Sequence, residues 1–312
     1  MKRNISKILI PTDFSEPSER ALKVGTAIAK RQKADITLLY VLDRYSHLQP
    51  SEVFLPGVKI GPDIKSSLEE KLNVLSKKIH ERTKINTTFK VVAGNPSDCI
   101  CEFAFQEDFS LIVMGSHGIS GIREFFMGSE AFRVVKNATC PVLTVPGDWQ
   151  KTEFGKILFP IRLIPGALDK YSFARPIIEK NKSELILLGL ADKKKPDEVY
   201  QIAGLMDKFK YQLHNDNVVF QPLLCPCENF PEKVINSANE NHVDLIVLTA
   251  NLDYDLKAYF IGAFSQQIVN HSKRPVLCIK PSMVVADKTD YSLLADKWGG
   301  EIDFSDVVVQ TD

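Results

Sequence analysis

The chain has 312 residues, a length typical of two globular domains. Lys plus Arg and Asp plus Glu both number 39, so the formal net charge is zero, and no basic block indicates a nucleic-acid surface or a polybasic membrane anchor. The apolar run Ile8–Ile10 is too short for a signal peptide, and no stretch approaches the ~20 apolar residues that a membrane helix needs. We therefore expect a cytoplasmic protein with no nucleic-acid or membrane partner.

Short apolar runs alternate with amphipathic helical segments along the first half of the chain. A buried strand is expected at Lys7–Pro11, followed by a helix that Ser15 can cap and that carries Pro17 in its first turn. Such alternation is typical of a parallel sheet covered by helices on both faces. The later elements expected are strands at Ile36–Val41, Thr87–Ala93, Leu111–Met114 and Val142–Val145, a long helix over Ile64–Ile79, and helices at Pro96–Asp108 and Ser129–Asn137.

The second half of the chain repeats this order. The Lys7–Pro11 segment recurs 149 residues later as Lys156–Pro160, and the Cys140–Val145 segment recurs 134 residues later as Arg274–Ile279. We therefore predict two copies of one domain, at residues 1–147 and 153–281, joined by a short linker. Residues 282–312 form a C-terminal extension that belongs to neither copy, although its apolar run Val307–Val309 could pack back onto the body. The strands expected in the second copy are 156–161, 185–189, 218–224, 245–249 and 276–279.

The six cysteines fit a reducing compartment. Cys225 and Cys227 are too close in sequence for the usual paired-ligand zinc spacing. We interpret all six as small buried or half-buried hydrophobic residues, with a redox role for the Cys225 and Cys227 pair as the alternative.

The most informative stretch is Gly115-x-x-Gly118, then nine residues, then Gly128 and Ser129. Gly115 directly follows the fourth predicted strand, and Ser129 opens the next helix. Glycine lets backbone N–H groups approach a ligand closely, and a helix N-terminus offers unpaired N–H donors and a partial positive charge. This arrangement predicts a phosphate-binding turn; the alternative is an ordinary flexible connection between strand and helix.

The position of this turn strengthens the interpretation. In doubly wound sheets, ligands bind beyond the carboxyl ends of the strands where the strand order reverses. For the order 3-2-1-4-5, that crevice lies between strands one and four. Asp13 follows strand one and Gly115 follows strand four, so we expect both to face the same crevice.

The glycine pattern resembles the G-x-x-G-(nine residues)-G-S/T signature of the ATP-binding universal stress proteins. Gly94-Asn95-Pro96 resembles that family's glycine-x-proline turn before the third helix. Cys140-Pro141-Val142 resembles its entry to strand five. The resemblance covers residues 5–146 well and 154–281 more faintly. It implies an α/β fold of two flavodoxin-like, Rossmann-like doubly wound parallel five-stranded sheets in tandem, each in the order 3-2-1-4-5, and a stress-response regulator that binds ATP with Mg²⁺.

The same resemblance implies roles for individual residues. Asp13, in Pro11-Thr12-Asp13, would accept from the adenine or ribose end, and Val41 would offer main-chain contacts to adenine. Gly128 and Ser129 would hold phosphate oxygens. Gly115, His117 and Gly118 would lie along the ribose and the phosphates. For His117, the alternative is that only its backbone contacts the ligand while its ring faces solvent. The full set of expected ATP-binding residues is Thr12, Asp13, Val41, Met114, Gly115, His117, Gly118, Gly128 and Ser129.

Glu130 places a carboxylate beside this expected phosphate site. Either it points outward as a first-turn acid that the helix dipole favours, or it lowers nucleotide affinity unless Mg²⁺ bridges. The sequence leaves both alternatives open.

The second copy departs from the pattern at nearly every position. Arg162 replaces Asp13, Thr249 replaces Gly115, Leu252 replaces Gly118 and Ala263 replaces Ser129, while Gly262 lies opposite Gly128. We therefore expect ATP in the N-terminal copy only. Arg162 would have either a structural partner or a different anionic ligand.

Three classes of function compete: a nucleotide-binding regulator, a slow ATPase or phosphotransferase, and a nucleotide-free scaffold or adaptor. No Walker-type G-x-x-x-x-G-K-S/T motif is present, so we expect slow hydrolysis at most. A regulator implies a protein partner, which the sequence does not identify. The resemblance further implies that Val142–Val145 and Val276–Ile279 pair antiparallel, which gives a pseudo-two-fold monomer that could also form a homodimer.

Overall fold

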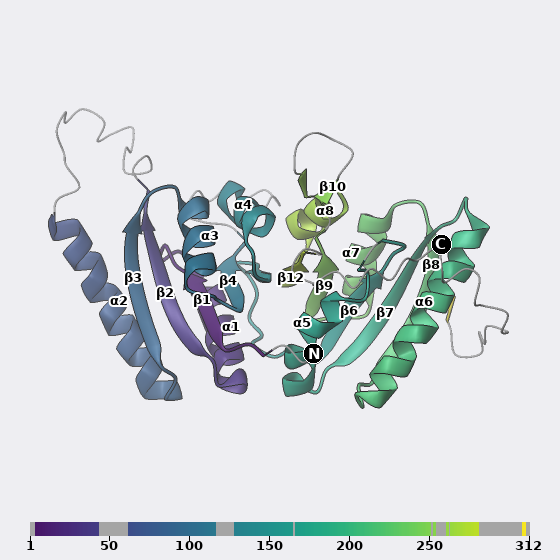
Figure 1. Cartoon of the computed structure of the whole chain (residues 1–312), viewed down its shortest axis with the longest axis horizontal. Coiled ribbons are helices and arrows are strands. Elements are labelled where there is room, and N and C mark those ends of the chain that lie inside the picture. The colour runs from purple at the N-terminus through teal and green to yellow at the C-terminus, as the bar shows by residue number, and fades with distance from the viewer. Residues whose placement is uncertain are drawn as a thin grey trace.

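The computed structural model describes residues 4–43, 62–116, 128–164, 166–250 and 263–280, together with short strands at 252–253, 260–261 and 308–309. In Figure 1 the first copy runs from purple to teal and the second from teal to yellow-green, with helices α2 and α6 at the two outer ends. Among the described residues, none of the helices is both long and apolar enough to cross a membrane.

The first copy has the predicted alternation of strands and helices. Ser15 caps the first helix as expected, because its side chain accepts a hydrogen bond from the Ser18 amide. The elements are β1 (Lys7–Pro11), α1 (Glu16–Gln32), β2 (Asp35–Leu42), α2 (Pro62–Thr83), β3 (Thr87–Ala93), α3 (Pro96–Gln106), β4 (Leu111–Gly115), α4 (Ser129–Asn137) and β5 (Val142–Val145).

The second copy follows the same order, and it contains a two-stranded hairpin that the sequence did not predict. Its first helix also begins later, after a turn that includes Gly166 at a positive φ of 67°. The elements are β6 (Lys156–Ile161), α5 (Lys170–Asn181), β7 (Glu184–Asp192), α6 (Pro196–Asn215), β8 (Phe220–Cys227), α7 (Phe230–Glu240), β9 (Leu245–Thr249), the hairpin strands β10 (Leu252–Asp253) and β11 (Phe260–Ile261), α8 (Ala263–His271) and β12 (Val276–Ile279).

Both copies have the predicted strand order, and together they build one continuous sheet. Its order is β13-β8-β7-β6-β9-β12-β5-β4-β1-β2-β3, and the strands are parallel within each copy. The two copies meet where β5 and β12 pair antiparallel, with Leu143 opposite Leu277. This pairing confirms the expected union through the fifth strands. The strand β13 (Val308–Val309) pairs in parallel with β8, so part of the apolar run at the C-terminus does pack onto the body.

Helices cover both faces of the sheet, and a hydrophobic core lies under each layer. One core is formed against α1, α2, α5 and α6, and the other against α3, α4, α7 and α8. Each core runs through both copies, because the inward side chains of β5 and β12 join it across the junction. The junction is therefore packed like the interior of a single domain.

Candidate functional site

The sheet positions the expected site at the reversal point of the first copy. Strand β1 lies next to β4, with Leu9 opposite Ile112, while β2 and β5 lie on their outer sides. The chain therefore leaves β1 and β4 at the same edge of the sheet. Thr12 and Asp13 follow β1 at this edge, and Gly115 ends β4.

The turn between β1 and α1 holds Asp13 in one orientation. Its Oδ1 accepts hydrogen bonds from the Ser15 amide at 3.0 Å and from the Ser15 hydroxyl at 2.5 Å. Phe14, between Asp13 and Ser15, has φ of 61°, a left-handed backbone conformation that residues other than glycine rarely adopt. The hydrogen bonds of Asp13 and Thr12 around Phe14 hold this strained conformation in place.

Thr12 and Tyr40 complete the frame of this turn. The Thr12 amide donates to the Leu39 carbonyl at 2.9 Å, and its Oγ1 accepts from the Phe14 amide at 3.2 Å. The Tyr40 ring stacks on the Phe14 ring with centroids 5.4 Å apart. Burial and, secondarily, the Asp13 carboxylate raise the pKa of Tyr40 above its usual value. Thr12 therefore stabilises the turn, since its side chain is buried and its hydroxyl already accepts from Phe14.

The side chains of Val41 and Met114 pack into the core under α3 and α4. Val41 is near the end of β2, opposite Val92 of β3, and its side chain packs against the core under α3 and α4. The Met114 side chain is only 7% exposed in the same core.

Gly115 is required by packing, independently of any ligand. A Cβ at this position would lie 2.9 Å from the backbone carbon and the Cβ of Pro17, in the first turn of α1. A backbone atom cannot give way as a flexible side-chain end can, so any larger residue would push α1 away from β4.

The N-terminus of α4 provides the donors of the expected phosphate site. The Gly128 amide donates to the Ser116 carbonyl at 2.9 Å, and the first amide bonded within the helix is that of Phe132, to the Gly128 carbonyl. Among the described residues, the amides of Ser129, Glu130 and Ala131 have no recorded acceptor, and Gly128 makes no side-chain cap. Ser129 itself is exposed. His117 and Gly118 lie outside the described residues.

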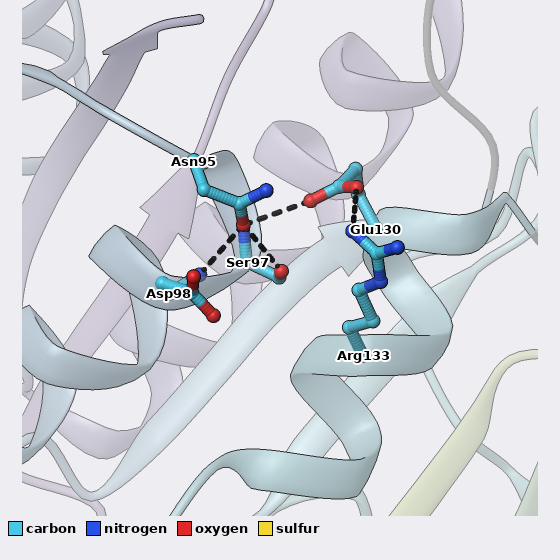
Figure 2. A network of polar contacts seen from close by, with 5 residues as sticks. All are labelled: Asn95, Ser97, Asp98, Glu130 and Arg133. Atoms are coloured by element: carbon cyan, nitrogen blue, oxygen red, sulfur yellow. Dashed lines mark hydrogen bonds and ion pairs between the residues drawn. The ribbon is translucent and has the colours of Figure 1, made fainter.

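The Glu130 carboxylate points away from its own helix tip towards the start of α3 (Figure 2). Its Oε2 accepts from the Ser97 amide at 2.9 Å, and its Oε1 pairs with the Arg133 guanidinium at 3.1 Å. The N-cap residue Asn95 accepts from the Asp98 amide at 3.2 Å, so the start of α3 is capped by two side chains. The Glu130 charge is therefore engaged by a helix N-terminus and a guanidinium.

Comparisons with known proteins show the family of the chain. The model of the universal stress protein family matches residues 4–146. Universal stress protein MJ0531 of Methanocaldococcus jannaschii is 38% identical over 144 residues, which cover 45% of this chain and 81% of that protein. The chain belongs to the universal stress protein family. A second relative of the same organism, universal stress protein MJ0577, is 35% identical over 155 residues, covering 45% of this chain and 93% of the relative.

A solved universal stress protein from Archaeoglobus fulgidus extends the likeness to both copies at the level of the fold. It has a TM-score of 0.69 and 19% sequence identity, and the match covers 89% of this chain and 97% of that one. A putative universal stress protein from Pseudomonas aeruginosa has a TM-score of 0.64 at 15% identity and covers 88% and 93%. The tandem arrangement of two such folds is therefore shared with solved structures.

The equivalent edge of the second copy of this universal stress protein is filled differently. The Arg162 guanidinium lies 3.6 Å from the ring centroid of Phe264, the second residue of α8. Thr249 is buried, and its carbonyl accepts from the Ser265 hydroxyl at 3.2 Å. Leu252 pairs with Ile261 in the hairpin, whereas Gly262 lies outside the described residues.

Sequence reasoning missed three residues that shape the site: Pro17 as the neighbour of Gly115, Ser97 as the partner of Glu130, and Lys280, whose ammonium reaches α4 from the second copy. Each acts across a long separation in sequence, so no local pattern marks the contact. Among the described residues, no group of three or more His, Cys, Asp or Glu side chains is placed to hold a metal ion.

Proposed function

We propose that the protein is a stress-response regulator that binds ATP in its first copy. The observation that carries the proposal is the start of α4, where the amides of Ser129, Glu130 and Ala131 lack acceptors among the described residues. Such a helix tip binds phosphate through its N–H groups and its partial positive charge. Asp13, which Ser15 holds beside the same reversal point, is suited to accept from adenine or ribose.

Mg²⁺ would arrive with the nucleotide. Magnesium in nucleotide sites is held by phosphate oxygens and water with only one or two protein ligands, so a preformed metal cluster is not required. In the first copy, Glu130 is engaged by the Ser97 amide and Arg133. The nucleotide phosphates are therefore the main ligands that we propose for the ion.

We propose that the second copy binds no ATP. Arg162 stacks on Phe264 at the start of α8, and the buried Thr249 stands where the first copy has Gly115 of the glycine pattern. One nucleotide per chain would give the protein two states, with and without ATP. A protein partner that distinguishes these states would complete the regulatory role.

Calorimetric titration with ATP and Mg²⁺ tests the proposal. We expect about one nucleotide per wild-type chain, none for Gly128→Val, and about one for Gly262→Val, the matched change in the second copy. Gly128 has φ of −56° and ψ of 145°, which valine also adopts, so loss of binding would report crowding of the helix tip rather than backbone strain. A stoichiometry near two, or loss of binding in Gly262→Val alone, would place the nucleotide elsewhere.

A further inference from the structure

Lys280 is a buried lysine that crosses the junction between the two copies. It follows β12 in the second copy, is only 8% exposed, and its Nζ donates to the Ala138 carbonyl of the first copy at 2.8 Å. Ala138 is the C-cap of α4, the helix whose opposite end forms the expected phosphate site. The contact follows from the antiparallel register, in which Cys278 lies opposite Val142 and the chain beyond β12 passes the start of β5.

The carbonyl end of α4 is the electrostatic partner of this ammonium. Burial lowers the pKa of Lys280, and the neighbouring groups that act on it are the thiols of Cys101 and Cys140. Among the described residues, no carboxylate forms an ion pair with Lys280. A helix C-terminus carries a partial negative charge, and cations there stabilise the helix most when partly buried. The buried amine is thus matched to a helix end.

Helix α4 is short, and three hydrogen bonds hold its two ends, besides the contact of the Cys101 thiol with the Val134 carbonyl along its length. At its start, the Gly128 amide bonds to the Ser116 carbonyl, and in its first turn Glu130 accepts from the Ser97 amide (Figure 2). At its end, Lys280 bonds to Ala138. The first two attachments come from the first copy, and the third comes from the second copy. The position of α4 relative to β4 therefore depends on both copies.

The described residues of the first copy offer no matching side chain to the end of α8 in the second copy. By the offset of 134 residues between the copies, Pro146 occupies the position of Lys280 and Ser272 that of Ala138. Proline has no side-chain donor. Both helices end with the same local amide bond, from Ala138 to Val134 in α4 and from Ser272 to Ile268 in α8, but in α8 the Ser272 hydroxyl also donates to the Arg274 carbonyl. The copy that carries the glycine pattern is the one whose helix end receives the cation.

We propose that Lys280 is a positioning residue for the phosphate-binding end of α4, so that the second copy completes the nucleotide site of the first. This inference rests on the proposed ATP site. It gives the copy that lost the glycine pattern a function: it contributes no ligand contact, but it holds the helix that makes them.

The first arm of the test compares ATP with adenosine in Lys280→Met. Methionine keeps an unbranched apolar stem only one atom shorter but removes the donor and the charge. We expect the Kd for ATP to rise about three- to tenfold, the scale of a partly buried cation at a helix end, while adenosine affinity stays within about twofold. Gln32→Ala is the control, because Gln32 also bonds across the junction, to the Pro176 carbonyl at 2.7 Å, but from α1 on the opposite face. It should leave both affinities unchanged.

The second arm needs no nucleotide. Hydrogen exchange of the α4 amides should accelerate in Lys280→Met and not in Gln32→Ala. Unchanged exchange and an unchanged ATP Kd in a folded Lys280→Met would overturn the inference, as would an equal loss of ATP and adenosine affinity. If the wild-type protein binds neither ligand, the proposed function fails, and the exchange measurement still decides whether Lys280 holds α4.

Discussion

The first copy carries Asp13 and Gly115 at the carboxyl ends of its strands, where the second carries Arg162 and Thr249. Both copies nevertheless have the same strand order, and the same two cores run beneath them. The helix that follows the first strand even ends at matching left-handed residues, Lys33 and Lys182, 149 residues apart. The turns of the expected site therefore differ between the copies, while the layers that hold the fold are the same.

The difference extends to the residue that packs on the fourth strand. In the first copy Pro17 approaches Gly115, which has no room for a side chain. By the offsets of 149 and 134 residues, the equivalent residues of the second copy are Gly166 and Thr249, so the small and the large residue have exchanged places. The loss of proline at this position accompanies the later start of α5 at Lys170.

Gly115→Thr installs the second-copy residue in the first copy and should have the largest effect. Its Cβ would lie 2.9 Å from Pro17 backbone, so we expect a loss of about 1–3 kcal/mol in the free energy of unfolding, together with loss of ATP binding. Urea unfolding and calorimetry measure the two effects. Adding Pro17→Gly should recover part of the stability, since it restores the exchanged pair. A single variant as stable as wild type would refute the packing argument.

A second contrast lies beneath the second site, where Lys170 is buried. Its Nζ donates to the carbonyls of Pro160 at 2.7 Å and Ala167 at 2.8 Å, and it lies 4.2 Å from the Phe159 ring centroid. The equivalent residue of the first copy, by the same offset, is the buried Ala21. Burial, and next the charge of Arg162, lower the pKa of Lys170 well below its usual value.

Lys170 should make stability depend on pH in the alkaline range. Because its pKa is lower in the folded than in the unfolded chain, the unfolded chain binds more protons between the two values, and the folded state gains stability as pH rises. The gain is at most about 1.4 kcal/mol per pH unit. We expect the wild type to gain stability relative to Lys170→Met between pH 7 and about 9.5 in urea unfolding. Parallel pH profiles would show that Lys170 is charged in the folded chain.

Much of the scaffold could be predicted because its signals are local or repeated. The cap at Ser15 and the start of α4 at Ser129 follow from residue type and position, and the pairing of β5 with β12 was expected from the family resemblance. Lys170 and Lys280 were not predicted, because a lysine in sequence indicates an exposed residue. Their burial arises from carbonyl groups that only the folded chain brings near them.

The role of Glu130 also depended on the fold, since its partner Ser97 is 33 residues away in sequence. The second copy has Phe264 at the equivalent position, where Arg162 stacks on the ring. At one place in the fold, therefore, the first copy has a carboxylate directed to α3 and the second has an aromatic platform for a cation. Of the contrasts between the copies, we expect this one to have the smallest effect on ATP affinity and stability.

Glu130→Gln tests whether the carboxylate opposes ATP. Because its charge is already engaged by the Ser97 amide and by Arg133, we expect the Kd for ATP to change by less than about threefold and unfolding stability to fall by less than about 1 kcal/mol. Arg133→Met is the matched change, and it should weaken ATP binding more than Glu130→Gln does, because it leaves the carboxylate without its cation. Titration at low ionic strength would maximise the difference between the two variants. An affinity gain of about tenfold or more in Glu130→Gln would show instead that the carboxylate repels the phosphates despite its contact with α3.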